Sequence, residues 1–487
     1  MLGRLLLLVV LARHPRALHA LPMRGFADLF QRAGGQGASP VGLLSLRPES
    51  LGLGPTPSPQ LLAERLEAAS PASETEDWRL QGLGRGPPSH RADLRLFDAP
   101  DSLEPAVTLF RDRAAWCPYC EKVWLQLEEK RVPYRVEKSP LRCYGEKTRQ
   151  HLAVNPSGML PVAIIKGRVI SESNLIMQEL EDAFPANRPL LPKRGSRLEE
   201  RVAPLMRLER RVFGSWFTWL TSRAGDSAAR EMDALLREVD EELGIGGGPY
   251  FLGEDFSLVD CMFAPFLERM AASLPYFKGF EVRCGRYPRL LRWYEAMDGR
   301  EAYRGLKSDY YTHCHDLPPQ IGACHSLPAA APFAAEIDGG AWRVGFSGGI
   351  EPMLPADPSV ARREAARSLL ANFEPVVRFA ARGAGERGVP GVAAPLADPN
   401  ARPNEAIVPA VDLALKMVAL SLVDGDLGVL ASPRVGAAGL PSGGRALRLS
   451  LEYLRDRVGV PRDMSAHAAR QLRAHLNLLL DALPQDG

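Results

Sequence analysis

Apolar and polar positions follow different rhythms in successive parts of the chain. Between residues 105 and 188, short apolar runs suit strands, and stretches with apolar residues three and four apart suit helices. The predicted strands are 107–110, 132–137, 162–165 and 168–170, and the predicted helices are 117–130, 144–154 and 174–184. Their order, β-α-β, a helix and then β-β-α, predicts a compact α/β unit with a small core of its own.

Strand patterns disappear between residues 195 and 306, where long stretches have helical spacing. Ser257 and Asp260 have the spacing of a capping box, which marks the start of one of these helices. This part is predicted to be an all-helical domain. A polar, proline-interrupted connector is predicted at 307–345, and helical stretches within 346–487 predict a third region built as a helical bundle.

The residues before the α/β unit carry two other signals. A basic residue and a short apolar run open residues 1–50, and an arginine-rich, acid-poor stretch follows. This pattern predicts a disordered two-part targeting leader, a signal peptide followed by a transit peptide, which favours a plastid over the cytoplasm as destination. Residues 51–104 are rich in proline, glycine, serine and charge around one amphipathic stretch at 60–69, which predicts a linker or an N-terminal arm.

Composition narrows the classes of partner. The 487 residues include 60 basic and 58 acidic side chains, and the formal net charge of +2 gives no reason to expect a nucleic-acid partner. No apolar run is long enough to cross a bilayer, so no membrane span is expected. The 7 cysteines are sparse and odd in number, unlike a secreted disulfide framework. The Cys-x-x-Cys pair at 117 and 120 therefore indicates redox or metal chemistry.

The Trp-Cys-Pro-Tyr-Cys motif at 116–120 lies between a predicted strand and a predicted helix. A cysteine at a helix N-terminus faces unpaired N–H groups and the positive end of the helix dipole, which favour its thiolate. Cys117 is therefore the predicted nucleophile, and Cys120, one turn later, is placed to resolve a mixed disulfide. Half of a zinc site is the alternative, but no second close cysteine pair exists, so redox chemistry without a metal is favoured.

The α/β unit resembles a thioredoxin fold, and together with the helical domain it resembles a cytosolic-type glutathione transferase. In that family the catalytic residue begins the first helix, which matches Cys117. The family's Gly-x-x-Pro turn matches residues 158–161. The resemblance implies a cis bond before Pro161, which presents the backbone of Leu160 to the cysteinyl part of glutathione.

The resemblance also implies glutathione-binding roles for three polar residues. Glu172 and Ser173 match the family's Glu-Ser pair, and Ser173 at a helix start is suited to hold the γ-glutamyl carboxylate. Lys147 aligns with a basic residue that contacts the glycyl carboxylate in cysteine-type members, although a solvated helix charge is an alternative reading. Glutathione is thus the implied co-substrate.

The residue type at position 117 points to the reaction. Conjugating members of the family use Tyr or Ser there, whereas a cysteine implies thiol–disulfide exchange through a mixed disulfide with glutathione. The expected activity is a glutathione-dependent thiol transferase or oxidoreductase, acting in deglutathionylation or dehydroascorbate-type reduction on a small-molecule or protein disulfide. The alternatives are a glutathione-binding scaffold or regulatory protein that acts through its third region, and a glutathione-conjugating transferase.

Two further features refine the resemblance. The two-cysteine motif, the third helical region and the segment at 308–320 are similar to the iota class of photosynthetic organisms, which also favours a plastid. The family often dimerises, so a homodimer is a candidate assembly. The role of the third region is not implied by the resemblance.

Two other patterns in the chain suggest a metal site and an esterase nucleophile, and a purely structural role is favoured for each. A cluster of potential metal ligands lies in the connector, but its spacing fits no standard zinc finger. A Gly-x-Ser-x-Gly pattern at 345–349 lacks the helix that an esterase nucleophile requires directly after it. A structural loop and a turn are expected instead. The cluster comprises His313, Cys314, His315, Cys324 and His325.

Overall fold

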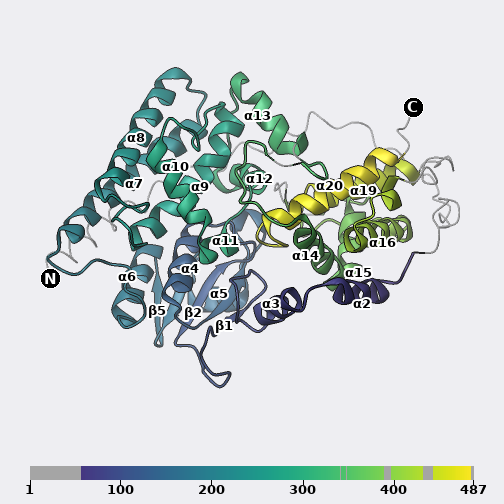
Figure 1. Cartoon of the computed structure of the whole chain (residues 1–487), viewed down its shortest axis with the longest axis horizontal. Coiled ribbons are helices and arrows are strands. Elements are labelled where there is room, and N and C mark those ends of the chain that lie inside the picture. Colours follow the sequence, from purple (N-terminus) through teal and green to yellow (C-terminus); the bar gives the residue numbers. More distant parts are fainter. Residues whose placement is uncertain (1–55, 341, 347, 389–395, 432–442, 484–487) are drawn as a thin grey trace.

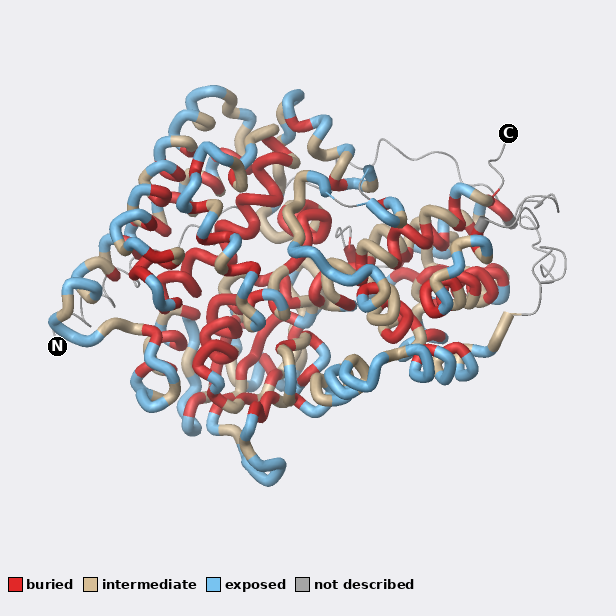
Figure 2. The backbone as a smooth tube through the Cα atoms, in the orientation of Figure 1, coloured by how far each residue is buried: buried red, intermediate tan, exposed pale blue. Residues whose placement is uncertain are grey.

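A computed structural model describes residues 56–340, 342–346, 348–388, 396–431 and 443–483 (Figure 1). The leader expected at 1–50 lies outside these residues. The buried side chains form two hydrophobic cores, and Figure 2 shows the buried backbone concentrated in two corresponding places. The first core joins the sheet to the helical domain, and the second belongs to the third region. The predicted order of a thioredoxin-like unit, an all-helical domain and further helices is confirmed.

The α/β unit is built on a 5-stranded sheet in the order β1-β3-β2-β4-β5. Strand β2 is parallel to β3 and antiparallel to β4, which in turn pairs antiparallel with β5. The short β1 was not predicted, because two residues give no readable alternation, and it joins the edge of the sheet antiparallel to β3. The strands are β1 Leu94–Arg95, β2 Val107–Asp112, β3 Tyr134–Ser139, β4 Val162–Ile165 and β5 Arg168–Ser171.

The helices of this unit are α4 Pro118–Lys130, α5 Arg149–Val154 and α6 Ser173–Ala183. The single helix expected at 144–154 is interrupted, and a short 3-10 turn, η2 Arg142–Tyr144, precedes α5. The interruption has a local cause. Gly145 has a φ of 138°, outside the helical range, and Thr148 then starts a new helix by accepting a hydrogen bond from the backbone N–H of His151.

The helical domain contains α7 Arg197–Leu220, α8 Asp226–Ile245, α9 Leu258–Lys278, α10 Pro288–Asp298 and α11 Glu301–Leu306. The predicted capping box at the start of α9 is present. The Asp260 carboxylate also accepts hydrogen bonds from the Phe251 backbone and the Trp293 indole, so the cap ties the start of α9 to α10 and to the preceding loop. Among the described residues, no helix is both long and apolar enough to span a bilayer.

The expectation of a connector was wrong for part of its length, because α12 Tyr310–Ile321 is a largely buried helix packed along α9. Asp309 caps α12 by accepting from the Thr312 N–H. The signal was present in the sequence: Tyr310, Cys314 and Leu317 have helical spacing and are all buried. The prolines that suggested a loop, at 318 and 319, fall in the last turns of the helix. Short elements follow: η3 Pro328–Ala330, α13 Ala331–Ala335 and η4 Glu336–Gly340.

The cluster of potential metal ligands was expected to form a structural loop, but three of its five members lie in α12. His313 Nε2 lies 2.5 Å from Glu268, and His315 Nε2 lies 2.7 Å from Asp338, so these histidines contact carboxylates of neighbouring elements. No helix occurs at residues 350–357, all of which are described, and the Gly-x-Ser-x-Gly pattern is therefore not followed directly by a helix.

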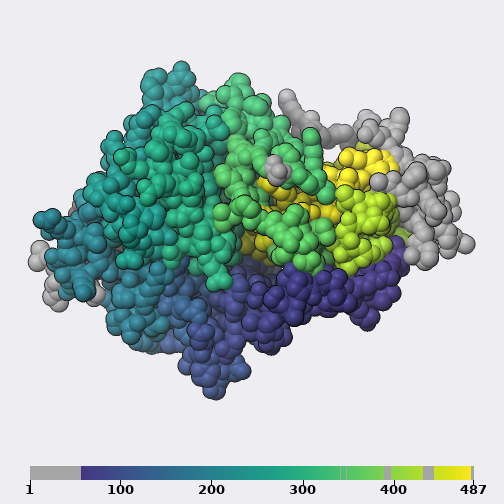
Figure 3. All heavy atoms as spheres, viewed as in Figure 1, coloured from purple at the N-terminus to yellow at the C-terminus, as the bar shows by residue number. Residues whose placement is uncertain are grey.

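The third region contains α14 Pro358–Ala371, α15 Phe373–Ala380, η5 Ala381–Ala384, α16 Val408–Asp424, α17 Gly428–Ala431, α19 Gly443–Arg455 and α20 Ala466–Ala482. Two helices from the segment expected to be a linker or an arm, α2 Pro59–Ala69 and α3 Ala72–Gly82, lie against it. Figure 3 shows the surface of this segment continuous with that of the third region. Leu62 and Leu66 of α2 are buried in the second core, and Glu74 of α3 pairs with Arg363 of α14. The segment is an arm folded onto the third region.

Candidate active site

Cys117 is the N-cap residue of α4, and Pro118 occupies the first helical position, where its missing N–H costs no hydrogen bond. The backbone N–H of Glu121 donates to the Cys117 carbonyl at 3.0 Å, which closes the first turn. The Cys117 side chain makes no capping hydrogen bond, so it is free for other chemistry at the positive end of the helix dipole. Only 6% of Cys117 is exposed, so access to its sulfur is narrow.

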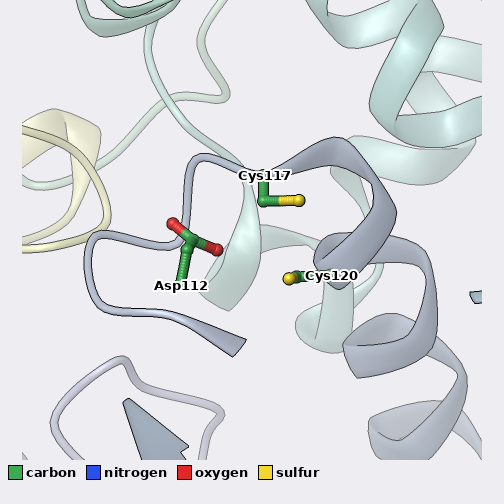
Figure 4. A group of neighbouring side chains, drawn as sticks. All are labelled: Asp112, Cys117 and Cys120. Atoms are coloured by element: carbon green, nitrogen blue, oxygen red, sulfur yellow. The ribbon is translucent and has the colours of Figure 1, made fainter. Parts of the chain in front are cut away.

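Cys120 and Asp112 converge on Cys117 (Figure 4). The two sulfurs and one carboxylate oxygen all lie within 4.8 Å of one another. Burial raises the pKa of the Cys120 thiol well above its ordinary value, and a hydrogen bond to Cys117 and the charges of Cys117 and Asp112 act in the same direction. Cys120 therefore stays protonated at neutral pH, which is the state expected of a resolving thiol before it attacks a mixed disulfide.

Asp112 ends strand β2 and holds the turn before the helix. Its Oδ2 accepts a hydrogen bond from the Trp116 backbone N–H at 2.6 Å, whereas its buried Oδ1 has no hydrogen-bond partner. The only group of three potential metal ligands found among the described residues is this same set, Asp112, Cys117 and Cys120. A structural zinc site uses four protein ligands, and this group supplies three.

Trp116, directly before Cys117, is fully buried and fixed at each of its polar groups. Besides the N–H bond to Asp112, its carbonyl accepts hydrogen bonds from Arg269 of α9 at 2.7 Å and Gln320 of α12 at 3.2 Å. Its indole N–H donates to the Val460 carbonyl, in the loop between α19 and α20, at 3.1 Å. The turn that carries Cys117 is thus held by the sheet, the helical domain and the third region together.

The register of the sheet brings the other predicted residues to the same edge. Phe110 of β2 lies opposite Val162 of β4, which lies opposite Ser171 of β5. The turn leading to Cys117 leaves from the end of β2, the 160–161 pair precedes β4, and the 172–173 pair follows β5. The Leu160–Pro161 bond is cis, as the resemblance implied.

Ser173 is the first residue of α6 and Glu172 is its N-cap, with a φ of 72° in the left-handed region. That conformation is uncommon for a residue with a side chain and marks a constrained turn at the helix start. Lys122 of α4 donates to the Asn174 side chain at 2.9 Å, which ties this helix start to the cysteine helix. The N–H groups at the beginning of α6 are placed to receive a carboxylate.

Lys147 lies between η2 and α5 and donates a hydrogen bond to the Pro140 carbonyl at 2.5 Å. Burial lowers the pKa of Lys147, and the charges of Cys120 and Cys117 oppose this shift. Lys147 is therefore partly buried, unlike the fully solvated helix charge that was the alternative interpretation.

Aromatic side chains line the helical domain on the side that faces α4. Tyr119 packs edge-on against Phe266 of α9, with ring centroids 5.7 Å apart, and Phe266 contacts Phe213 of α7 at 4.9 Å. Trp216 and Trp219 of α7 are buried and fill the first core.

Sequence reasoning missed Asp112 and the residues that hold the Trp116 carbonyl and indole. A signal existed for Asp112, which is the polar residue that ends the strand before the Cys-x-x-Cys motif. Arg269, Gln320 and Val460 gave no local signal, because each reaches the turn from an element far away in sequence.

Comparison with known proteins agrees with this architecture. The family described as glutathione S-transferase, N-terminal domain, matches residues 116–183, and the family described as glutathione S-transferase, C-terminal domain, matches residues 205–296. Fold and matches together define a thioredoxin-like domain paired with an all-helical domain of the transferase type.

Three individual relatives each match about two fifths of the chain or less. Glutathione S-transferase DHAR2 of Arabidopsis thaliana is 26% identical over 193 residues, 39% of this chain and 84% of the relative. A stringent starvation protein A homolog of Pasteurella multocida is 33% identical over 173 residues, 34% of this chain and 74% of the relative. The crystal structure of glutathione transferase Omega 3C from Trametes versicolor is 28% identical and covers 42% of this chain and 91% of that chain, with a TM-score of 0.36. The chain belongs to the glutathione transferase family.

Proposed function

We propose that this protein is a glutathione-dependent thiol transferase in which Cys117 is the nucleophile. The observation that carries the proposal is the position of Cys117 at the N-cap of α4, with the Cys120 sulfur and an Asp112 oxygen within 4.8 Å. The free N–H groups of the first turn stabilise a thiolate at this position, and the neighbouring protonated thiol is placed to act after it.

The reaction proceeds by two exchanges of one disulfide bond for another. The Cys117 thiolate attacks the glutathionyl sulfur of a mixed disulfide, a Cys117–glutathione bond forms, and the substrate leaves as a thiolate that takes up a proton. A second glutathione thiolate then attacks the Cys117–glutathione bond, which releases oxidised glutathione and restores Cys117. Alternatively, Cys120 loses its proton and attacks Cys117, which releases reduced glutathione and leaves a Cys117–Cys120 disulfide.

The edge of the sheet supplies the groups that would hold the tripeptide. The backbone of Leu160 before the cis Pro161 is suited to pair with the cysteinyl part, and Ser173 at the start of α6 is suited to the γ-glutamyl carboxylate. Glu172 sets the turn before that helix, and Lys147 supplies a cation for the glycyl carboxylate. Dehydroascorbate is a second oxidised substrate that the same thiol chemistry can reduce.

Mass spectrometry of the reduced full-length protein after incubation with oxidised glutathione tests the proposal. We expect one glutathionyl group on the Cys117 peptide or a Cys117–Cys120 disulfide, and Cys120→Ser should accumulate the glutathionyl form. Cys117→Ser should form neither, whereas Cys284→Ser, which changes a half-buried cysteine of the helical domain, should behave as the wild type does.

The other candidate functions predict different results. If wild type formed no adduct on Cys117, a scaffold or regulatory protein acting through the third region would replace the thiol transferase, and retention on a glutathione column would show whether that scaffold binds glutathione. Turnover of a chlorinated aromatic that survives in Cys117→Ser would instead identify a conjugating enzyme.

We also propose that residues 1–50 direct the protein to a plastid, on the basis of their basic, acid-poor composition after an apolar run. A fluorescent protein fused behind these residues should enter the plastid of an alga whose plastids are reached through the secretory route. A fusion that stays in the cytoplasm would contradict this destination.

A further inference from the structure

The loop between α19 and α20 reaches from the third region to the turn that carries Cys117. In Figure 1 the start of α20 and the chain before it lie at the centre of the molecule, beside α12. We call residues 458–463 the docking loop. Val460 in this loop is 1% exposed, and both of its backbone polar groups form hydrogen bonds with residues outside the third region.

The hydrogen bonds of Val460 fix the loop to two segments, the turn before α4 and the start of α12. Its carbonyl accepts hydrogen bonds from the Trp116 indole at 3.1 Å and from the Ser308 hydroxyl, and its N–H donates to the Thr312 hydroxyl at 3.2 Å. The indole N–H of Trp116 thus has its hydrogen-bond acceptor in the third region. A buried indole N–H left without an acceptor is unfavourable, so this contact resists separation.

The backbone of the loop lies so close to the Trp116 ring that no side chain fits between Gly459 and the ring. A Cβ added at Gly459 would lie 2.6 Å from Trp116 Cζ2, closer than real carbon contacts allow. The Arg462 guanidinium lies over the same indole, 4.9 Å from the ring centre, and Tyr144 packs against the ring at 5.2 Å. Gly459 is therefore required by the close approach of the backbone to the ring.

The docking loop is itself held in place by the helices on either side of the junction. Arg473 of α20 donates to the Val458 carbonyl at 2.6 Å and pairs with Asp309, the cap of α12, at 2.5 Å. The Gly459 N–H donates to the Asp463 carboxylate at 2.8 Å. These hydrogen bonds fix the backbone conformation of the loop where it contacts Trp116.

We propose that the docking loop is a positioning element of the thiol site, so that the third region sets the reactivity of Cys117 through Trp116. The inference rests on the proposed function, because it assigns a role toward the same nucleophile. Trp116 and Cys117 share one peptide group, and the other side of that turn is fixed to Asp112. Because Asp112 and Arg269 hold the backbone of Trp116, a displaced indole must strain the peptide group that Trp116 shares with Cys117, and we infer that this strain shifts the Cys117 sulfur relative to the helix N–H groups and to any bound disulfide. Misplacement by about 1 Å is enough to slow a reaction about a hundredfold.

Gly459→Ala in the full-length protein tests the proposal, because the new methyl group must displace the Trp116 ring. The matched control is Gly285→Ala, where an added Cβ meets nothing within 4 Å. Alkylation by iodoacetamide is followed against pH by peptide-resolved mass spectrometry. Cys284, in the helical domain, is the internal reference in the same molecule.

We expect Gly459→Ala to lower the alkylation rate of Cys117 at least tenfold or to shift its pH midpoint, with the Cys284 rate unchanged. The kcat for a glutathionylated substrate should fall with it, while Gly285→Ala matches the wild type. If Gly459→Ala does not fold, Trp116→Phe, which removes the indole N–H and keeps an aromatic ring, takes its place.

The proposal is overturned if a folded Gly459→Ala, or Trp116→Phe in its stead, shows the wild-type alkylation rate and pH midpoint at Cys117. Failure of the proposed function looks different. In that case wild-type Cys117 would be alkylated with a defined pH midpoint, which Gly459→Ala would change, but wild type would turn over no glutathionylated substrate.

Discussion

The packing of α2 into the second core predicts that the arm stabilises the third region. Leu62 and Leu66 are 0% and 1% exposed, whereas the adjacent Leu61 is 43% exposed. Truncation of a fully buried leucine to alanine costs about 3–5 kcal/mol, because the lost apolar contact is compounded by a cavity. Leu62→Ala or Leu66→Ala should therefore favour opening of the third region by a factor of about a hundred or more, at about 1.4 kcal/mol for each tenfold change.

Hydrogen exchange resolved by peptide measures this opening directly, because slow amides report the free energy of the local opening that exposes them. Peptides from α14 and α16, which pack against α2, should lose about a hundredfold or more of their protection in either variant. Peptides from β2 and β4, in the first core, should keep theirs. Leu61→Ala is the control on the same helix and should change stability by less than about 0.5 kcal/mol.

Protection of α14 and α16 within about twofold of the wild type in both variants would refute the reasoning, since no buried leucine loses its contacts so cheaply. An equal loss in β2 and β4 would also contradict it. That result would mean that the two cores unfold as one unit and that the arm is not specific to the third region.

Two further predictions concern titration near the site. Asp112→Asn removes a negative charge that raises the pKa of Cys120. Attack of Cys120 on a Cys117–glutathione bond should therefore begin at lower pH, which is measured as the rate of glutathione release against pH. An unchanged pH profile would contradict the role of that charge. Burial, reinforced by the charge of Arg210, lowers the pKa of Lys122 to about 7. In the unfolded chain the pKa of this lysine is about 10.4. Between pH 7 and this value the unfolded state therefore binds one more proton than the folded state. The free energy of unfolding then rises with pH, by at most about 1.4 kcal/mol per pH unit. Lys122→Met should lack this rise in urea titrations made between pH 7 and 10, and an identical slope in both proteins would exclude Lys122 as its source.

The sequence was most informative where periodicity and caps agree. Strand β4 was predicted at its observed bounds, and the capping box at Ser257 marked the start of α9. The Cys-x-x-Cys motif between a strand and a helix placed Cys117 at a helix N-cap, and the cis bond before Pro161 followed from the resemblance. All of these features depend on residues within a few positions of one another.

Features that depend on contacts between residues far apart in the sequence could not be predicted from local patterns. The prolines at 318 and 319 suggested a loop, whereas packing against α9 stabilises a helix up to and through them. The arm looked like a linker because α3 exposes most of its polar surface and pairs its charges with α14. The Val460 contact with Trp116 joins residues 344 positions apart, and no local pattern encodes it.

The second core is assembled from both ends of the chain. The leucines of α2 leave the ribosome early, but α14 and α16, which pack against α2, are made only after the sheet and the helical domain. Until these helices are made, the leucines of the arm lack the partners that cover them in the folded protein. Completion of the third region covers these leucines and brings the docking loop to Trp116, so a polypeptide truncated before this region should carry a folded transferase body with an unfinished thiol site.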